Sequence, residues 1–89
     1  MEKHIYIKVA GKVQGVGFRY HTQKMADELN INGFVKNEYD GSVYIEASGE
    51  TGNIDQFVNW CYKGPQWAQV ENVEISKNRV KHFGTFLLR

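Results

Sequence analysis

Residues 11–19, Gly-Lys-Val-Gln-Gly-Val-Gly-Phe-Arg, separate two segments of the 89-residue chain that have different hydrophobic periods. Before them, in residues 4–10, apolar side chains alternate with histidine, tyrosine and lysine, which is typical of a half-buried strand. After them, in residues 18–29, apolar side chains recur at helical spacing with charged residues on the other side. The segment therefore predicts a loop that connects a strand directly to a helix.

This loop has the features of an anion-binding site. Gly15 and Gly17 allow turn conformations that bring several backbone N–H groups to one point. A helix N-terminus follows at once, and its free amides and positive dipole end face the same concavity. Arg19 adds a planar guanidinium that can bind two oxygens of a phosphate or carboxylate. A glycine-rich turn with a surface arginine would show the same local spacing, so the loop alone leaves both interpretations open.

The loop differs from the commoner phosphate-binding loops. Gly11-Lys12 is followed by Val13, where a Walker loop requires serine or threonine. The third glycine of a dinucleotide-binding fingerprint would stand where this chain has Tyr20. Residues 11–18 contain no cysteine, so a loop thiol does not attack the group that binds here.

Residues 11–19 resemble the first signature of the acylphosphatase family, and a second segment strengthens the resemblance. Residues 33–43, Gly-Phe-Val-Lys-Asn-Glu-Tyr-Asp-Gly-Ser-Val, with Gly49 further on, are similar to the family's second signature. Asn37 follows Arg19 by 18 positions, in the family's order. The resemblance covers nearly the whole chain and is weaker after residue 65. Asn30 stands where relatives commonly have glycine, and asparagine also tolerates the left-handed conformation at a helix end.

The resemblance implies an enzyme that hydrolyses the carboxyl–phosphate bond of an acyl phosphate to a carboxylate and inorganic phosphate. It implies that loop amides bind the phosphoryl group, that Arg19 clamps it, and that Asn37 positions the attacking water. The phosphate-binding residues would be Gln14, Gly15, Val16, Gly17, Phe18 and Arg19. The substrate would be a small molecule and inorganic phosphate would be both product and inhibitor, with no metal ion and no cofactor required.

This reaction makes few demands on the side chains. The leaving group is a carboxylate whose conjugate acid has a pKa of about 4, so it departs without a general acid. The enzyme then needs only to position the reactants and stabilise charge. An amide has no useful basicity, so Asn37 can orient water while a phosphate oxygen takes the proton. Two alternatives stay open: Arg19 as a surface ion-pair partner, and Asn37 as a residue that caps the hairpin.

The middle of the chain predicts the end of a helix and then a hairpin. Residues 30–33 are typical of a helix stop. The Asp-Gly pair at 40–41 is a strong hairpin signal between expected strands at 34–37 and 42–48.

The last third of the chain predicts a second helix and the closing strands. Asn53 is expected to cap this helix with Gln56 as its capping-box partner, and the Gly-Pro pair at 64–65 ends it. Strands are expected at 70–76 and 81–88. The order strand, helix, strand, strand, helix, strand, with an additional edge strand at the C-terminus, predicts a ferredoxin-like α/β (α+β) sandwich, in which two helices cover one face of an antiparallel sheet.

Composition limits the possible partners. We expect a single domain, residues 1–89. The formal net charge of +1 favours neither a nucleic acid nor an anionic membrane as partner. No apolar run has membrane-spanning length, and the N-terminus lacks the apolar core of a signal peptide. The single cysteine, Cys61, excludes an internal disulfide and suits a reducing compartment, so we expect a cytoplasmic protein. We also expect a monomer.

Two other functions remain open on the sequence. The RNA-recognition module has the same fold, residues 5–9 look like its first-strand motif, and Tyr6 and Tyr44 would share the open sheet face. However, residues 42–48 lack that module's central motif, and the neutral charge also argues against it. The second alternative is a catalytically silent anion-binding or regulatory domain, which intact Arg19 and Asn37 disfavour.

Other chemically notable side chains have structural interpretations. His21, two residues after Arg19, is expected to be an exposed residue at the helix start, because this chemistry needs no base. His4 and His82 are far apart in sequence and are not expected to form a metal site. Packing roles are expected for Trp60, Cys61 and Trp67.

Overall fold

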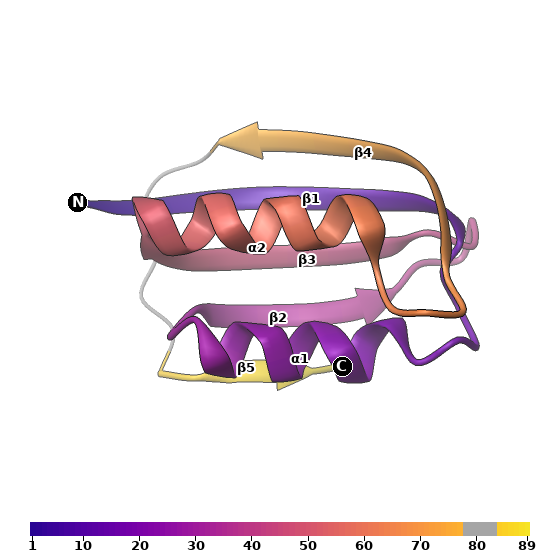
Figure 1. Ribbon diagram of the computed structural model, residues 1–89, viewed down its shortest axis with the longest axis horizontal. Helices are drawn as coiled ribbons and strands as arrows, with labels where there is room; N and C mark the ends of the chain where they lie inside the picture. Colours follow the sequence, from indigo (N-terminus) through magenta and orange to yellow (C-terminus); the bar gives the residue numbers. More distant parts are fainter. Residues whose placement is uncertain (78–83) are drawn as a thin grey trace.

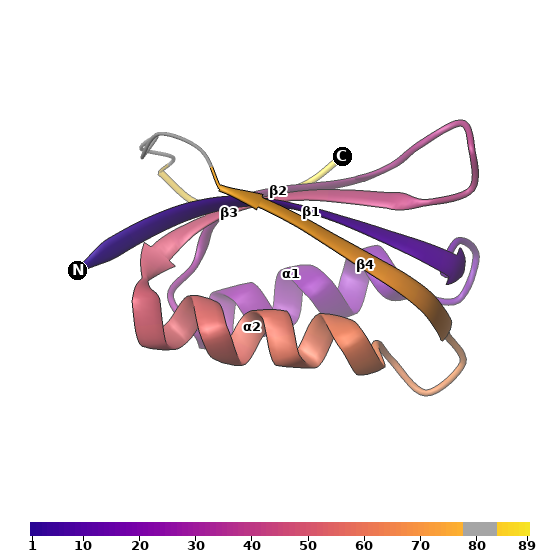
Figure 2. The ribbon, with the colours of Figure 1, turned by 90° about the horizontal axis from the view of Figure 1, so that it is seen from above.

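The protein folds into a five-stranded sheet with two helices on one face (Figure 1). The computed structural model describes residues 1–77 and 84–89. In chain order the elements are β1 (Glu2–Lys12), α1 (Phe18–Glu28), β2 (Asn32–Asn37), β3 (Val43–Glu50), α2 (Thr51–Lys63), β4 (Gln69–Lys77) and β5 (Phe86–Leu88). The view turned by 90° shows both helices on the same side of the sheet (Figure 2).

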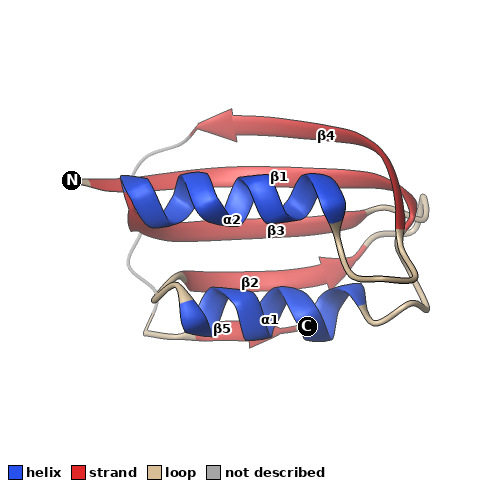
Figure 3. Ribbon diagram, in the orientation of Figure 1, coloured by secondary structure: helices blue, strands red, loops and turns tan. Residues whose placement is uncertain are grey.

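The strands follow the order β4-β1-β3-β2-β5 (Figure 3). The pairs β1–β3, β1–β4 and β2–β3 are antiparallel, whereas β5 pairs with β2 in parallel, with Phe86 opposite Gly33. The predicted ferredoxin-like sandwich and its C-terminal edge strand are confirmed. The sheet is nevertheless mixed rather than wholly antiparallel, because β5 runs in the same direction as β2. β5 begins at Phe86, and the predicted strand residues 81–83 lie outside the described part of the chain.

The core lies between the sheet and the helices. Alternate residues of each strand face it, because successive side chains of a strand point to opposite faces. From β1 and β3 the fully buried apolar residues are Ile5, Ile7, Val9, Val43, Ile45 and Ala47. The helices contribute Phe18, Thr22, Ala26, Ile54, Phe57 and Cys61. Burial of a large apolar side chain stabilises a fold by about 1.5–3 kcal/mol. Because Phe18 is the first residue of α1, its burial in this core holds the start of α1 against the sheet.

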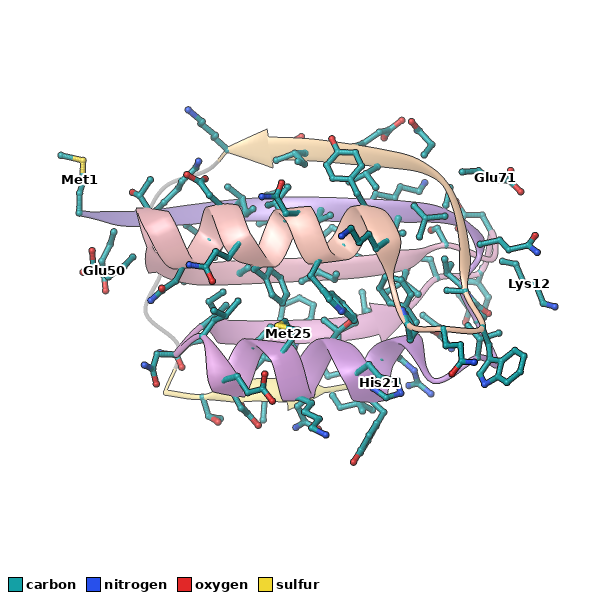
Figure 4. All side chains as sticks on the ribbon, viewed as in Figure 1. Met1, Lys12, His21, Met25, Glu50 and Glu71 are labelled. Carbon is teal, nitrogen blue, oxygen red and sulfur yellow. The ribbon has the colours of Figure 1, made fainter. Side chains whose placement is uncertain are left out.

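The start of α2 differs from the prediction. The helix begins at Thr51 rather than after a cap at Asn53, so the predicted capping box of Asn53 and Gln56 is wrong. Sheet pairing continues to Glu50, opposite Glu2, and the chain enters the helix directly from the strand. Both the amide and the hydroxyl of Thr51 donate to the main-chain oxygen of Met1, each over 2.9 Å. Pairing with the N-terminal residues therefore fixes this helix start; Figure 4 shows Met1 and Glu50 close together at that end.

The two predicted helix ends are confirmed. Asn30, directly after the C-cap of α1, has a φ of 55°, the left-handed conformation that asparagine tolerates. Gly64 is the C-cap of α2 and its amide donates to the oxygen of Trp60 over 2.8 Å. Both signals were local, and local chemistry decided both ends.

Candidate active site

The loop between β1 and α1 has the turn geometry that its glycines predict. Gly15 and Gly17 have φ values of 73° and 79°, in the left-handed region that costs other residues roughly 1–2 kcal/mol. Gly17 is also the N-cap of α1. The two left-handed residues fold the loop over the start of the helix at the end of the molecule where β2 also ends (Figure 1).

The N-terminal end of α1 is available to an anion. The first N–H groups of a helix have no partner within it, and the aligned peptide dipoles place partial positive charge there. Within the described residues, α1 has no side-chain cap bond and no acidic residue in its first turn. An anion at this end would therefore meet donors and positive charge without competition from an acidic side chain of the first turn.

A cavity of about 170 Å³ lies at this end of the helix. It is lined by Val13, Gly15, Gly17, Phe18, Arg19, Tyr20, Asn37 and Leu88. The ring of Phe18 is buried against Trp60, so Phe18 presents its main chain to the cavity. The fold thus brings Arg19 and Asn37 to one cavity, although they come from a helix start and a strand end.

Arg19 is half-buried and its orientation is fixed by the residue that follows the last strand. Its Nη1 donates to the main-chain oxygen of Arg89 over 2.7 Å. The amide of Arg89 in turn donates to the oxygen of Val35 over 2.8 Å, which holds this end of β5 against β2. The remaining guanidinium N–H groups stay available for a second acceptor, because the side chain carries five.

Asn37 is the last residue of β2 and is exposed to solvent. It pairs with Val43 of β3 and lies on the same face as Val35, the face that the helices cover. β5 reaches only as far as Val35 in the pairing, so Asn37 extends beyond its neighbour strand on that side. Its side chain is therefore placed at the rim of the cavity, where water has access.

Two of the predicted phosphate-binding residues are placed differently from the rest. Among the described residues, neither Gln14 nor Val16 lines the cavity. Val16 packs against the hydrophobic core. The side chain of Gln14 turns to the β2–β3 hairpin, where its Nε2 donates to the oxygens of Glu38 and Ser42 over 2.7 and 2.9 Å.

Three lining residues and the Arg89 acceptor were missed from the sequence. Tyr20 had a usable signal, because it directly follows Arg19 at the helix start. Leu88 and Arg89 had none, because only the parallel pairing of β5 with β2 brings them to the loop. Val13 is buried and contributes the apolar floor of the loop.

The turn of the hairpin is stabilised by its own polar contacts. One carboxylate oxygen of Asp40 accepts from the amide and the hydroxyl of Ser42 over 3.0 and 2.6 Å. The other lies 2.8 Å from Nζ of Lys8. The hydrogen bond from Lys8, together with those from Ser42, holds the pKa of Asp40 well below its usual range. The same pair raises the pKa of Lys8.

His21 is exposed, as predicted, and lies near the start of α1 (Figure 4). It is not among the residues that line the cavity. Its ring contacts that of Tyr20 edge-on, with 5.2 Å between centroids. It lines a separate open groove of about 420 Å³ with Lys24, Met25, Glu28, Trp60, Pro65, Gln66 and Trp67. Trp60 packs against Phe18 as predicted. The packing role predicted for Trp67 is wrong, because 71% of this residue is exposed in the loop after α2.

The other reactive groups lie away from the cavity. Cys61 is in the core, as predicted, and burial raises the pKa of its thiol. His4 is buried on the open face of the sheet, and its Nε2 lies 3.1 Å from a carboxylate oxygen of Glu46. His82 lies outside the described residues. No group of three or more His, Cys, Asp or Glu side chains that could hold a metal ion occurs in the described part of the chain.

Tyr6 and Tyr44 share the open face of the sheet, as the sequence predicts, with 5.9 Å between ring centroids. Burial and the neighbouring Glu46 carboxylate raise the pKa of Tyr44 to about 12, so it stays a neutral phenol near pH 7.

None of the described helices is long and apolar enough to cross a membrane.

Comparison with known proteins identifies the family. A family model described as Acylphosphatase matches residues 5–87. A protein named acylphosphatase from Oceanobacillus iheyensis is 53% identical over 76 residues, which cover 84% of each chain. An acylphosphatase from Archaeoglobus fulgidus is 48% identical over 80 residues, or 90% of each chain. The solved structure of an acylphosphatase from Coxiella burnetii superposes with a TM-score of 0.95 at 40% identity, covering 99% of this chain and 93% of that one. Because sequence and fold agree over almost the whole length, this chain belongs to the acylphosphatase family.

Proposed function

We propose that this chain is an acylphosphatase acting on a small-molecule acyl phosphate through the 170 Å³ cavity at the start of α1. Arg19 clamps the phosphoryl group, the amides around Gly15 to Phe18 bind its oxygens, and Asn37 orients the attacking water. One observation supports this best: Arg19, the free end of α1 and Asn37 border the same cavity.

The reaction follows from these positions. The oxygen of water attacks phosphorus as the bond from phosphorus to the acyl oxygen breaks, and that electron pair leaves with the carboxylate. A phosphate oxygen takes the water proton, so the products are a carboxylate and inorganic phosphate. Charge on the phosphoryl oxygens in the transition state is stabilised by Arg19 and the helix amides, which are aimed before the substrate arrives.

The acyl group is expected to project outward past Tyr20 and Leu88. Both line the cavity, and they are 59% and 40% exposed. An exposed rim provides apolar contact without enclosing the acyl group, so we propose little discrimination among acyl groups. We further propose that residues 1–89 act as one domain, as a monomer in the cytoplasm.

The decisive assay compares benzoyl phosphate with p-nitrophenyl phosphate. We expect rapid hydrolysis of the first and almost none of the second. The leaving group of a phosphate monoester is poorer than a carboxylate, so its departure benefits from a proton donor or a metal ion. The proposed mechanism supplies neither. Comparable rates on both substrates would contradict the proposal. Phosphate binding without turnover of either substrate would instead favour the silent anion-binding domain.

A further inference from the structure

Gln14 connects the phosphate-binding loop to the hairpin that carries Asn37. Its side-chain amide has two N–H donors, and both are used: one bond goes to the oxygen of Glu38 (2.7 Å) and the other to the oxygen of Ser42 (2.9 Å). These acceptors lie 24 and 28 residues further along the chain. They stand on opposite arms of the hairpin, so a single side chain holds both arms.

The two acceptors flank the position of Asn37. Glu38 directly follows Asn37, and Ser42 directly precedes Val43, which is the pairing partner of Asn37. On its other side Asn37 has no strand neighbour among the described residues, because the β2–β5 pairing ends at Val35. Gln14 therefore provides a restraint on this strand end that the sheet does not provide.

The hairpin does not depend on Gln14 for its own structure. The oxygen of Ser42 also accepts from the amide of Glu38 over 2.9 Å, and the oxygen of Glu38 accepts from the amide of Gly41 over 3.2 Å. Asp40 adds its bonds to Ser42 and its ion pair with Lys8. If the Gln14 side chain is removed, both carbonyls keep a partner and the turn stays folded, but the loop and the hairpin are no longer joined by this side chain.

We propose that Gln14 is a positioning residue, whose side chain sets the separation between the bound phosphoryl group and the water held by Asn37. This inference rests on the proposed function. It differs from the phosphate-binding role that the family signature implies for the main chain of this residue. Displacement of a reacting group by about 1 Å can cost on the order of 10²-fold in rate, so loss of the bridge should slow catalysis without emptying the phosphate site.

The first test uses Gln14→Met, which keeps the length of the side chain and removes both donors. We expect kcat on benzoyl phosphate to fall by about 10- to 100-fold, with little change in competitive inhibition by inorganic phosphate. Gln23→Met is the matched control, because Gln23 on α1 also donates from Nε2 to a main-chain oxygen, that of Phe86, over 3.3 Å. We expect the control to keep its kcat. Thermal melting of both variants tests whether they are folded.

The second test asks whether Gln14 acts through Asn37. In an Asn37→Ala background, Gln14→Met should cause little additional loss, because the group that it positions is gone. Gln14→Glu adds a pH-dependent readout. Its carboxylate repels the two carbonyl oxygens, whereas the protonated carboxyl donates one hydrogen bond, so its kcat relative to wild type should rise as the pH falls from 8 to 5.

The outcomes separate the inference from the proposed function. If the wild type does not hydrolyse benzoyl phosphate, the proposed function fails and this inference fails with it. If the wild type is active and folded Gln14→Met keeps its kcat, only the inference is overturned. It is also overturned if phosphate inhibition weakens in step with kcat, or if the losses from Gln14→Met and Asn37→Ala multiply in the double variant.

Discussion

The guanidinium of Arg19 is hydrogen-bonded to the main-chain oxygen of Arg89, 70 residues further along the chain, over 2.7 Å. The side chain that we propose as the clamp of the phosphoryl group is thus oriented by the residue that follows edge strand β5, rather than by its own helix. A long arginine side chain loses considerable rotamer freedom when it binds a ligand, and an acceptor already in place reduces that cost.

Arg19→Ala should lower kcat/KM on benzoyl phosphate by at least 10²- to 10³-fold, because it removes a charge-assisted contact to the transferring group. Arg19→Lys should retain part of the activity, since an ammonium keeps the charge but lacks the planar fork. Competition by inorganic phosphate should weaken in both variants. Near-complete activity in a folded Arg19→Ala protein would place the clamp elsewhere.

Asn37→Ala should lower kcat, by a factor on the order of 10², far more than it weakens phosphate inhibition. The reason is that loss of a contact to the nucleophile raises the barrier without removing contacts to the bound phosphoryl group. Asn32→Ala, at the other end of the same strand, is the matched control. If Asn37 only caps the hairpin, its variant will melt at a lower temperature and keep its turnover per folded molecule.

Gly15→Ala should destabilise the fold by roughly 1–2 kcal/mol and weaken phosphate binding, because alanine is strained at a φ of 73°. Gly52→Ala in α2 should instead stabilise by roughly 0.5–1 kcal/mol, since alanine favours a helix. A Cβ at either position meets no atom within 4 Å, so the pair isolates backbone conformation from packing. Denaturant unfolding measures the change in the free energy of unfolding for both variants. Changes of the same sign would contradict this account.

Asp40→Asn should lower stability at pH 7, and the difference from wild type should shrink as the pH falls below about 4. The pKa of Asp40 is lower in the folded protein, mainly because of the hydrogen bond from Lys8. A carboxyl of this kind stabilises the fold above its unfolded pKa, and the contribution is lost as the pH falls through its folded pKa. Melting temperatures from pH 7 to pH 2 measure the effect.

Local signals in the sequence predicted much of the fold and part of the candidate site. The two loop glycines, Asn30 and the Asp40-Gly41 turn each carry their conformational reason within a few residues, and the structure has each conformation. The second helix start was mispredicted because pairing of Glu50 with Glu2 overrides a capping signal at Asn53. The reason is separation along the sequence. A helix cap depends on residues a few positions apart, whereas the register of a sheet depends on strands that are distant in sequence.

Parts of the candidate site depend on contacts between distant segments, and these were not predictable. Leu88 reaches the cavity only through a parallel strand pair, and the periodicity around it shows no sign of that partner. The side chain of Gln14 reaches two carbonyls on another element, and its residue type permits such bonds without indicating where they go. Exposure of Trp67 also follows from the path of the chain after α2.

Because the proposed clamp, Arg19, depends on the end of β5 for its orientation, we expect the core to form before the enzyme becomes active. β5 is a three-residue strand at the edge of the sheet, so its pairing with β2 adds few contacts and is expected late in folding. A chain that has packed α1 and α2 onto β1–β4 would contain the loop and Asn37 but leave the guanidinium without its acceptor. During refolding of a Trp67→Phe variant, fluorescence from Trp60 would therefore report collapse of the core, and the return of hydrolysis would report docking of the last strand.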